Sequence, residues 1–368
     1  MLLINKILNL RMKLNQLTFT RFIAAILIVF FHFGNNTILA SSNITAPIVK
    51  QANLGVSYFF ILSGFVMMIA YSHKKIDFKQ YYLNRFARIF PAYFFSLLLI
   101  LFFQIVHHFP INWRAFLLNV FAIQAWFPGY ATSFNFTGWS LSVEVFFYLC
   151  FPILLHYFYQ KFHKKEILIS VILVWLVTQL FFHYSLNTYY KSDSSFSHDL
   201  LFYFPSMHLS SFLVGNATGI FYLYLVEKKR HSDFYHLLLI FLLILLYLLL
   251  KYPPPVNFHN GLLAILFVPI ILSLSLVEKS MPILTSKLSI FLGEISYGIY
   301  ILQYPVIVYS PAICKRMGIP DGFYSYLLCL CIVSALSYFF LEQPLRRFIS
   351  NGFRWGNLPK GNTKKTFG

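Results

Sequence analysis

Two ionisable side chains lie within the first long apolar stretch of the chain. In RFIAAILIVFFH, Arg21 and His32 are eleven positions apart, and at about 100° per residue they return to within roughly 20° of one direction on a helix. Both would therefore lie on one helix face, separated by about 16 Å along the axis. A histidine held there can take a proton from a hydroxyl, and an arginine can bind an anionic group.

A structural interpretation of this pair also stays open. Arg21 can extend its charged end to lipid headgroups, and His32 can be a helix-packing histidine whose hydrogen bonds are satisfied. A polar or charged group inside a membrane helix is costly and is therefore usually paired or functional. Because the residues between the two are wholly apolar, the pattern favours a functional role for His32.

Glu144 is the carboxylate that we predict to pair with His32. It lies in GWSLSVEVFFYLCFP, at a depth that the topology below makes similar to that of His32. A carboxylate that accepts one imidazole N–H fixes the tautomer and leaves the other nitrogen to act as a general base. Two alternatives are that Glu144 caps the helix entry after Trp139 and Ser140, or that it pairs with an arginine.

A second basic feature is RFARIFPAY at 85–93. Arg85 and Arg88 are spaced i, i+3 and share one helix face. Because a guanidinium binds phosphate as a planar fork, this face predicts a polyphosphate site at the cytoplasmic mouth of the bundle. Arginines that only set the membrane topology would look similar.

The composition predicts a membrane protein. The 368 residues are 58% hydrophobic and 11% charged, with a mean hydropathy of +0.68, more than a soluble core requires. The net charge of +18 comes from clusters between apolar runs, which indicates topology and anionic lipid rather than nucleic acid. The cysteines have no zinc or disulfide spacing, and we predict no metal: Cys150, Cys314, Cys329 and Cys331.

Apolar length predicts an all-α, polytopic integral membrane helix bundle with about ten transmembrane helices. The predicted spans are 17–35, 52–71, 87–106, 138–159, 167–184, 201–225, 235–250, 261–277, 288–309 and 322–341. The segment 112–130 is shorter and more polar. We expect it to be a surface or re-entrant segment, covered by protein or lining a cavity.

The basic residues predict the orientation of these spans. With the N-terminus inside, all but six of the 29 basic residues lie on the cytoplasmic side, as the positive-inside rule requires. Both termini are then cytoplasmic. The first apolar stretch lacks a cleavage site and should stay as an anchor. We predict a transmembrane domain over 1–345 and a basic cytoplasmic tail over 346–368.

Small residues at helix-packing spacing occur in GVSYFFILSGFVM at 55–67 and in SSFLVGNATG at 210–219. Such residues let two helix backbones approach closely, so we expect these segments to be structural. His208, just before the second segment, is an additional candidate for a cavity residue.

In this order and spacing, the motifs resemble the acyltransferase-3 family of membrane O-acyltransferases, which modify cell-surface sugars. The resemblance covers nearly the whole chain, through Arg21 to His32, FFILSGF at 59–65, RFARIFPAY at 85–93, WSLSVEVFFY at 139–148, SYGIY at 296–300 and LEQPLRR at 341–347. It implies an acyl-CoA donor, most simply acetyl-CoA, that enters from the cytoplasm. It also implies a multi-pass location in a bacterial inner membrane.

The resemblance implies His32 as the catalytic residue, with Arg21 as its companion, and Arg85 and Arg88 as contacts of CoA. Our own addition to the catalytic set is Glu144. Within the motifs we also predict residues that contact the substrates. Tyr93 is predicted to contact the acyl donor. The residues predicted to contact the acceptor are Trp139, Ser142, Tyr297 and Gln303.

Two departures from the family pattern matter. Gln303 stands where many members are expected to have a histidine, and glutamine can hydrogen-bond but cannot titrate. Some members also carry a C-terminal hydrolase-like domain, whereas here the sequence ends shortly after the last predicted span. We therefore expect transfer to the final acceptor to be direct or to use a separate protein.

The predicted reaction has His32 deprotonate a hydroxyl of a surface glycan, or of its lipid-linked precursor, so that the hydroxyl attacks the thioester. A covalent acyl-histidine is the less favoured variant. The rival interpretation is a transporter or flippase, which also needs buried charges and would show inverted repeats. The sequence predicts membrane lipid as a partner. It leaves the oligomeric state open, and a homo-oligomer is one of the possible states.

Overall fold

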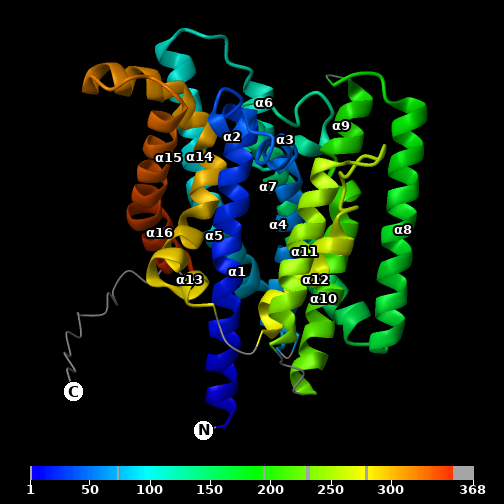
Figure 1. Cartoon of the computed structure of the whole chain (residues 1–368). Coiled ribbons are helices and arrows are strands. Elements are labelled where there is room, and N and C mark those ends of the chain that lie inside the picture. Colours follow the sequence, from blue (N-terminus) through cyan, green and yellow to red (C-terminus); the bar gives the residue numbers. More distant parts are fainter. Residues whose placement is uncertain (1, 73, 194, 229–232, 278–280, 351–368) are drawn as a thin grey trace, which may run out of the picture.

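The computed structural model describes residues 2–72, 74–193, 195–228, 233–277 and 281–350. Within these ranges every regular element is a helix and none is a strand. Most helices run side by side along the long direction of the molecule (Figure 1). The protein is therefore an all-α bundle, as the sequence predicts.

Nine helical segments of the described chain are long and apolar enough to cross a membrane: Asn15–Phe33, Ala52–Tyr71, Phe78–Val106, Phe136–Tyr159, Lys164–Tyr189, Phe196–Glu227, Phe234–Lys251, Lys287–Met317 and Phe323–Ser350. They match nine of the ten predicted spans, and the protein is a multi-pass membrane protein. The tenth predicted span, 261–277, forms the shorter helix α12 (Ala264–Leu276).

The principal helices are α1 (Leu2–Phe33), α4 (Gly55–Tyr71), α5 (Phe78–Val106), α7 (Trp139–Leu154), α8 (Lys164–Tyr189), α10 (Leu209–Glu227), α11 (Phe234–Lys251), α14 (Lys287–Met317) and α15 (Phe323–Ser337). The connections between them contain the short helices α2 (Ile38–Ser41), α3 (Ala46–Lys50), α6 (Trp113–Val120), α9 (Phe196–Phe202) and α13 (Pro282–Thr285). The last element, α16 (Gln343–Ser350), follows α15.

The segment 112–130 does not form a long helix. It contains α6 and a short 3-10 helix (Gln124–Trp126), followed by turns that lead to a second 3-10 helix (Phe136–Gly138) just before α7. Tyr93 of α5 holds this segment, because its hydroxyl donates to the carbonyl oxygen of Asn119 at 2.9 Å. The segment is covered by protein only in part, because Asn119 and Gln124 are buried whereas Phe121 and Phe127 are exposed. Its position relative to the membrane stays a prediction.

Glycines allow α4 and α10 to pack closely. A Cβ atom on Gly64 would lie 2.2 Å from the carbonyl oxygen of Phe212, and one on Gly215 would lie 2.0 Å from that of Ile61. No side chain fits at such distances, so the two backbones are in direct contact. The predicted packing role of both small-residue segments is confirmed.

The start of α1 and the helix α16 lie at the same end of the bundle (Figure 1). The amide of Gln80, near the start of α5, donates to the carbonyl oxygen of Ser350 at 3.0 Å.

The predicted boundary after residue 345 falls inside α16, and residues 351–368 of the predicted tail lie outside the described ranges. The cytoplasmic location of this end stays a prediction.

Candidate active site

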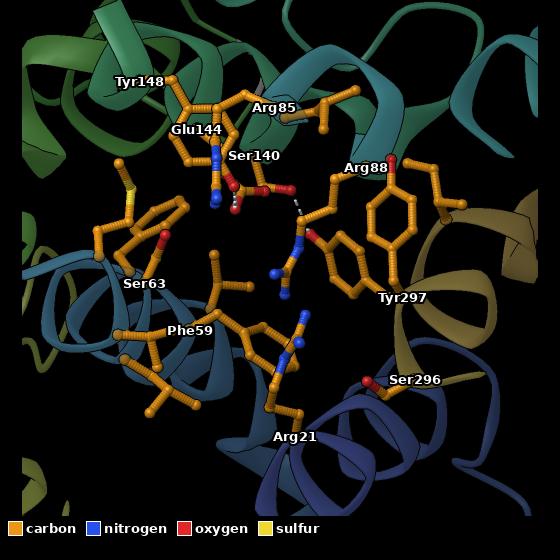
Figure 2. A pocket seen from close by; sticks show the side chains of 18 of the residues that line it. Arg21, Phe59, Ser63, Arg85, Arg88, Ser140, Glu144, Tyr148, Ser296 and Tyr297 are labelled. Carbon is orange, nitrogen blue, oxygen red and sulfur yellow. Dashed lines mark hydrogen bonds between the residues drawn. The ribbon is translucent and has the colours of Figure 1, made fainter. Parts of the chain in front are cut away.

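A cavity of about 220 Å³ lies among α1, α4, α5, α7 and α14. Its polar lining comes from all five helices, and Figure 2 shows the guanidinium groups of Arg21 and Arg88 pointing into it from two sides. The polar lining residues are Thr18, Arg21, Ser63, Arg85, Arg88, Ser140, Glu144, Tyr148, Ser296, Tyr297 and Tyr300. Residues separated by more than 250 positions thus meet at one place.

The charge of this cavity is unbalanced. Arg21, Arg85 and Arg88 face a single lining carboxylate, Glu144, which accepts a hydrogen bond from Tyr148. Glu342, outside the lining, also interacts electrostatically with Arg21 and Arg88, so three guanidinium groups are near two carboxylates. Among the described residues, no ion pair joins Glu144 to these arginines. Desolvated positive charge without an equal negative charge is costly, and an anionic ligand would offset that cost through charge-assisted hydrogen bonds.

Aromatic side chains hold Arg85 at the cavity wall. Its guanidinium carbon lies 5.5 Å from the ring centroid of Tyr148 and 5.6 Å from that of Tyr71, within the range of cation–π attraction. One terminal nitrogen also donates to the Tyr71 hydroxyl at 3.2 Å. These contacts orient the guanidinium but add no negative charge.

His32 lies at the end of α1 and is hydrogen-bonded to Gln303 of α14. The distance from Nδ1 of His32 to Oε1 of Gln303 is 2.8 Å. The amide nitrogen of Gln303 donates to the carbonyl oxygen of Tyr300 at 2.7 Å, so Oε1 is the acceptor and Nδ1 must carry the proton. The neutral imidazole then keeps Nε2 unprotonated, which is the state that a general base requires.

The predicted pairing of Glu144 with His32 is wrong. The ring centroid of Phe136 lies 4.8 Å from that of His32, but Phe136 precedes α7, whereas Glu144 is in the second turn of α7. Glu144 is therefore deeper in the bundle than His32, among the arginines. The alternative of a pair with an arginine is met in position only, because Glu144 lines the cavity with three arginines but, among the described residues, forms no ion pair with them.

The arginine cavity and the His32 site are neighbours along α14. Tyr300 lines the cavity, and its hydroxyl donates to Oγ of Ser140 at 2.8 Å. Gln303 is one helical turn further along the same helix, a rise of about 4.5 Å. The two places are thus adjacent along one helix, although neither Gln303 nor His32 lines the cavity.

A family model described as an acyltransferase domain, that of the acyltransferase-3 family, matches residues 14–348. The chain belongs to the acyltransferase-3 family. This match includes all five helices of the cavity and both residues of the His32–Gln303 pair, so the site is part of the family's shared domain.

Curated relatives of this acyltransferase-3 protein include O-acetyltransferase OatA of Staphylococcus aureus, 22% identical over 344 residues, and peptidoglycan O-acetyltransferase OatA of Listeria monocytogenes, 23% identical over 360 residues. Each alignment covers 85% of this chain and 56% of the relative, so the chain spans about half the length of these relatives. Acyltransferase MdmB of Streptomyces mycarofaciens is 31% identical over 151 residues, which cover 38% of this chain and 39% of that protein. No solved structure matches the chain.

Three residues that we predicted as ligand contacts lie outside the cavity lining of this acyltransferase-3 protein. Tyr93 is fully buried, and its hydroxyl donates to the carbonyl oxygen of Asn119. Trp139 packs on the rings of His208 and Tyr203, with centroid distances of 5.2 and 5.0 Å. Ser142 is fully buried, and it does not line the cavity.

The remaining predicted residues divide between two places. Arg21, Arg85, Arg88, Glu144 and Tyr297 line the cavity, whereas His32 and Gln303 form the pair beside it. The additional candidate His208 is buried, and its Nε2 is hydrogen-bonded to the carbonyl oxygen of Phe202 at 3.0 Å.

Sequence reasoning missed two tyrosines of the cavity. Tyr148 follows Glu144 by four residues, a spacing that places both on one helix face, and this signal was available in WSLSVEVFFY. Tyr300 is the last residue of SYGIY, and helix periodicity alone does not show that it faces Ser140 of another helix. Both hydroxyls complete the polar lining.

Proposed function

We propose that this protein is an O-acetyltransferase of the bacterial inner membrane. It would transfer an acetyl group from acetyl-CoA to a hydroxyl of a cell-surface glycan or of its lipid-linked precursor. The names of the curated relatives support acetyl transfer. The observation that carries the proposal is a histidine with one fixed tautomer, bound to Gln303 one helical turn beyond Tyr300 of the arginine cavity.

Acetyl-CoA is an anionic ligand that suits this cavity. Arg21, Arg85 and Arg88 can bind its phosphate groups, because guanidinium forks match phosphate oxygens. The cavity, at about 220 Å³, is smaller than the ~300–1,000 Å³ typical of ligand pockets. Only part of the donor would therefore lie inside, with the acetyl thioester directed along α14 toward His32.

His32 would act as the general base. Its Nε2 takes the proton of the acceptor hydroxyl while the oxygen attacks the thioester carbonyl carbon, forming a C–O bond. The C–S bond then breaks, and the CoA thiolate takes the proton from the imidazolium. Gln303 accepts the Nδ1–H bond throughout, so the ring keeps its orientation while Nε2 gains and loses the proton.

The test is a transfer assay in vesicles with labelled acetyl-CoA and a glycan acceptor. His32→Gln should reduce the transfer rate by about 10²–10⁴-fold, the usual contribution of a general base. The matched control is His156→Gln, because His156 is exposed and outside the cavity lining, and it should retain full activity. Undiminished transfer by His32→Gln would exclude this mechanism.

A further inference from the structure

A second, apolar cavity lies on the other side of α1 from the arginines. It is a groove of about 400 Å³ between α1 and α11, with α4 and α12 forming the floor. α3 packs against both α1 and α11 at one end, and α13 packs against α1 at the other. We call this space the α1–α11 groove.

The walls of the α1–α11 groove suit hydrocarbon. They are formed mainly by aliphatic and aromatic side chains such as Ala24, Leu243 and Phe267. The two hydroxyls in the lining are already engaged, because Thr20 donates to a backbone carbonyl at 2.8 Å and meets the Tyr58 hydroxyl at 2.5 Å. An occupant therefore gains by burying apolar surface rather than by forming hydrogen bonds.

The length of the groove matches one lipid chain. Along α11 the lining extends from Leu239 to Leu250, which corresponds to about 16 Å of helix. The hydrocarbon core of a bilayer is about 30 Å thick, so the groove spans about one leaflet.

Two lysines, Lys50 and Lys251, lie at the end of the groove where α3 packs against α1 and α11. Gln51 of the lining donates to the carbonyl oxygen of Leu250 at 2.8 Å, and this bond brings together the two segments that carry Lys50 and Lys251. Both lysines are exposed, and Lys251 also lies over the Tyr252 ring at 5.6 Å. Among the described residues, no ion pair with a carboxylate involves either lysine.

We propose that the α1–α11 groove binds one chain of an anionic phospholipid, whose phosphate group lies at Lys50 and Lys251. An apolar slot of one-leaflet length, with two lysines that have no carboxylate partner at one end, complements both parts of such a lipid. The lipid is held by the groove whether or not acyl transfer takes place, and it lies outside the arginine cavity.

Photolabelling in vesicles tests the proposal. The purified full-length protein is placed in phosphatidylcholine vesicles with a trace of phosphatidylglycerol that carries a photoreactive acyl chain, and labelled peptides are identified by mass. The expected sites are on α1, α11 and α12, and the same photoreactive chain on phosphatidylcholine should label them less. Equal labelling by both probes, or labelling spread evenly over all lipid-facing helices, would overturn the proposal.

Variants separate the headgroup contact from the chain contact. Lys50→Ala with Lys251→Ala should reduce groove labelling by phosphatidylglycerol about five- to thirtyfold, and labelling by phosphatidylcholine should stay unchanged. Leu243→Trp should reduce labelling by both probes, because the larger ring fills the slot. An unchanged pattern in either variant would contradict the assignment.

A matched control exists in another apolar groove, of about 340 Å³, among α8, α10 and α12. Ile172 lines it and is 46% exposed, close to the 48% of Leu243. Ile172→Trp should leave labelling of the α1–α11 groove unchanged. An equal loss in Ile172→Trp would show that the effect of the Leu243 change is not local.

Discussion

The two polar regions beside α1 differ in how their charge is arranged. The cavity around Arg21 gathers three guanidinium groups and one lining carboxylate, whereas the site around His32 contains one imidazole and one neutral amide, joined by a 2.8 Å hydrogen bond. The first arrangement suits an anionic ligand, and the second suits a histidine with one protonated ring nitrogen. In the proposed mechanism, one helix thus carries a residue for donor binding, Arg21, and a residue for proton transfer, His32, about three turns apart.

This difference corrects the role of Glu144. Beside His32, a carboxylate would stabilise an imidazolium, whereas Gln303 cannot supply charge and only orients the ring. Among the arginines, Glu144 reduces the excess positive charge of the cavity. In the proposed enzyme, Glu144 therefore balances charge in the arginine cavity, whereas His32 and Gln303 serve proton transfer. Four substitutions test this division of roles.

The largest effect is expected from Gln303→Leu. Without the acceptor for Nδ1–H, the imidazole of His32 loses its preferred tautomer and orientation, so kcat should fall about 100-fold, within the usual contribution of a general base. The KM for acetyl-CoA should stay the same, and Gln303→His should retain most of the activity, because histidine can also accept that bond. A wild-type kcat in Gln303→Leu would contradict the orienting role.

Arg88→Ala should act on the other region. Loss of a charge-assisted hydrogen bond, worth about 1.5–3 kcal/mol, should weaken acetyl-CoA binding by about ten- to a hundredfold, with little change in kcat at saturating donor. Arg88→Lys should restore part of the affinity, since it keeps the charge without the fork. Arg114→Ala, on α6, is the control, and equal losses in Arg88→Ala and Arg114→Ala would argue against a phosphate site in the cavity.

Glu144→Gln should change kcat by less than about threefold, because the side chain has no hydrogen bond to His32 and the amide oxygen can still accept from Tyr148. Acetyl-CoA affinity should stay the same or increase as the cavity becomes more positive. Steady-state kinetics measure both quantities. A loss as large as that of Gln303→Leu would return Glu144 to the catalytic pair.

The smallest effect on transfer is expected from Tyr93→Phe, since Tyr93 lies in neither region. Removal of its buried hydrogen bond to Asn119 should lower the free energy of unfolding by about 1 kcal/mol. Thermal unfolding in detergent should show that loss, and kcat and KM should match those of the wild type. A selective increase in the KM for acetyl-CoA would instead support the predicted donor contact.

The sequence by itself determined the elements and the faces of individual helices. Apolar length set the spans, and the eleven-residue spacing of Arg21 and His32 set their shared face, because helix geometry repeats every 3.6 residues. The i, i+3 spacing of Arg85 and Arg88 likewise placed both in one cavity. These are local properties, and a local rule is sufficient to predict them.

Only the tertiary structure decided which helices face one another and at what depth. His32 and Gln303 are 271 positions apart, and the meeting of their side chains depends on how α1 and α14 pack. The irregular chain before α7 sets the depth at which that helix begins, so Glu144 meets arginines rather than His32. Helix rotation and depth follow from close packing between helices, and no spacing within one helix encodes them.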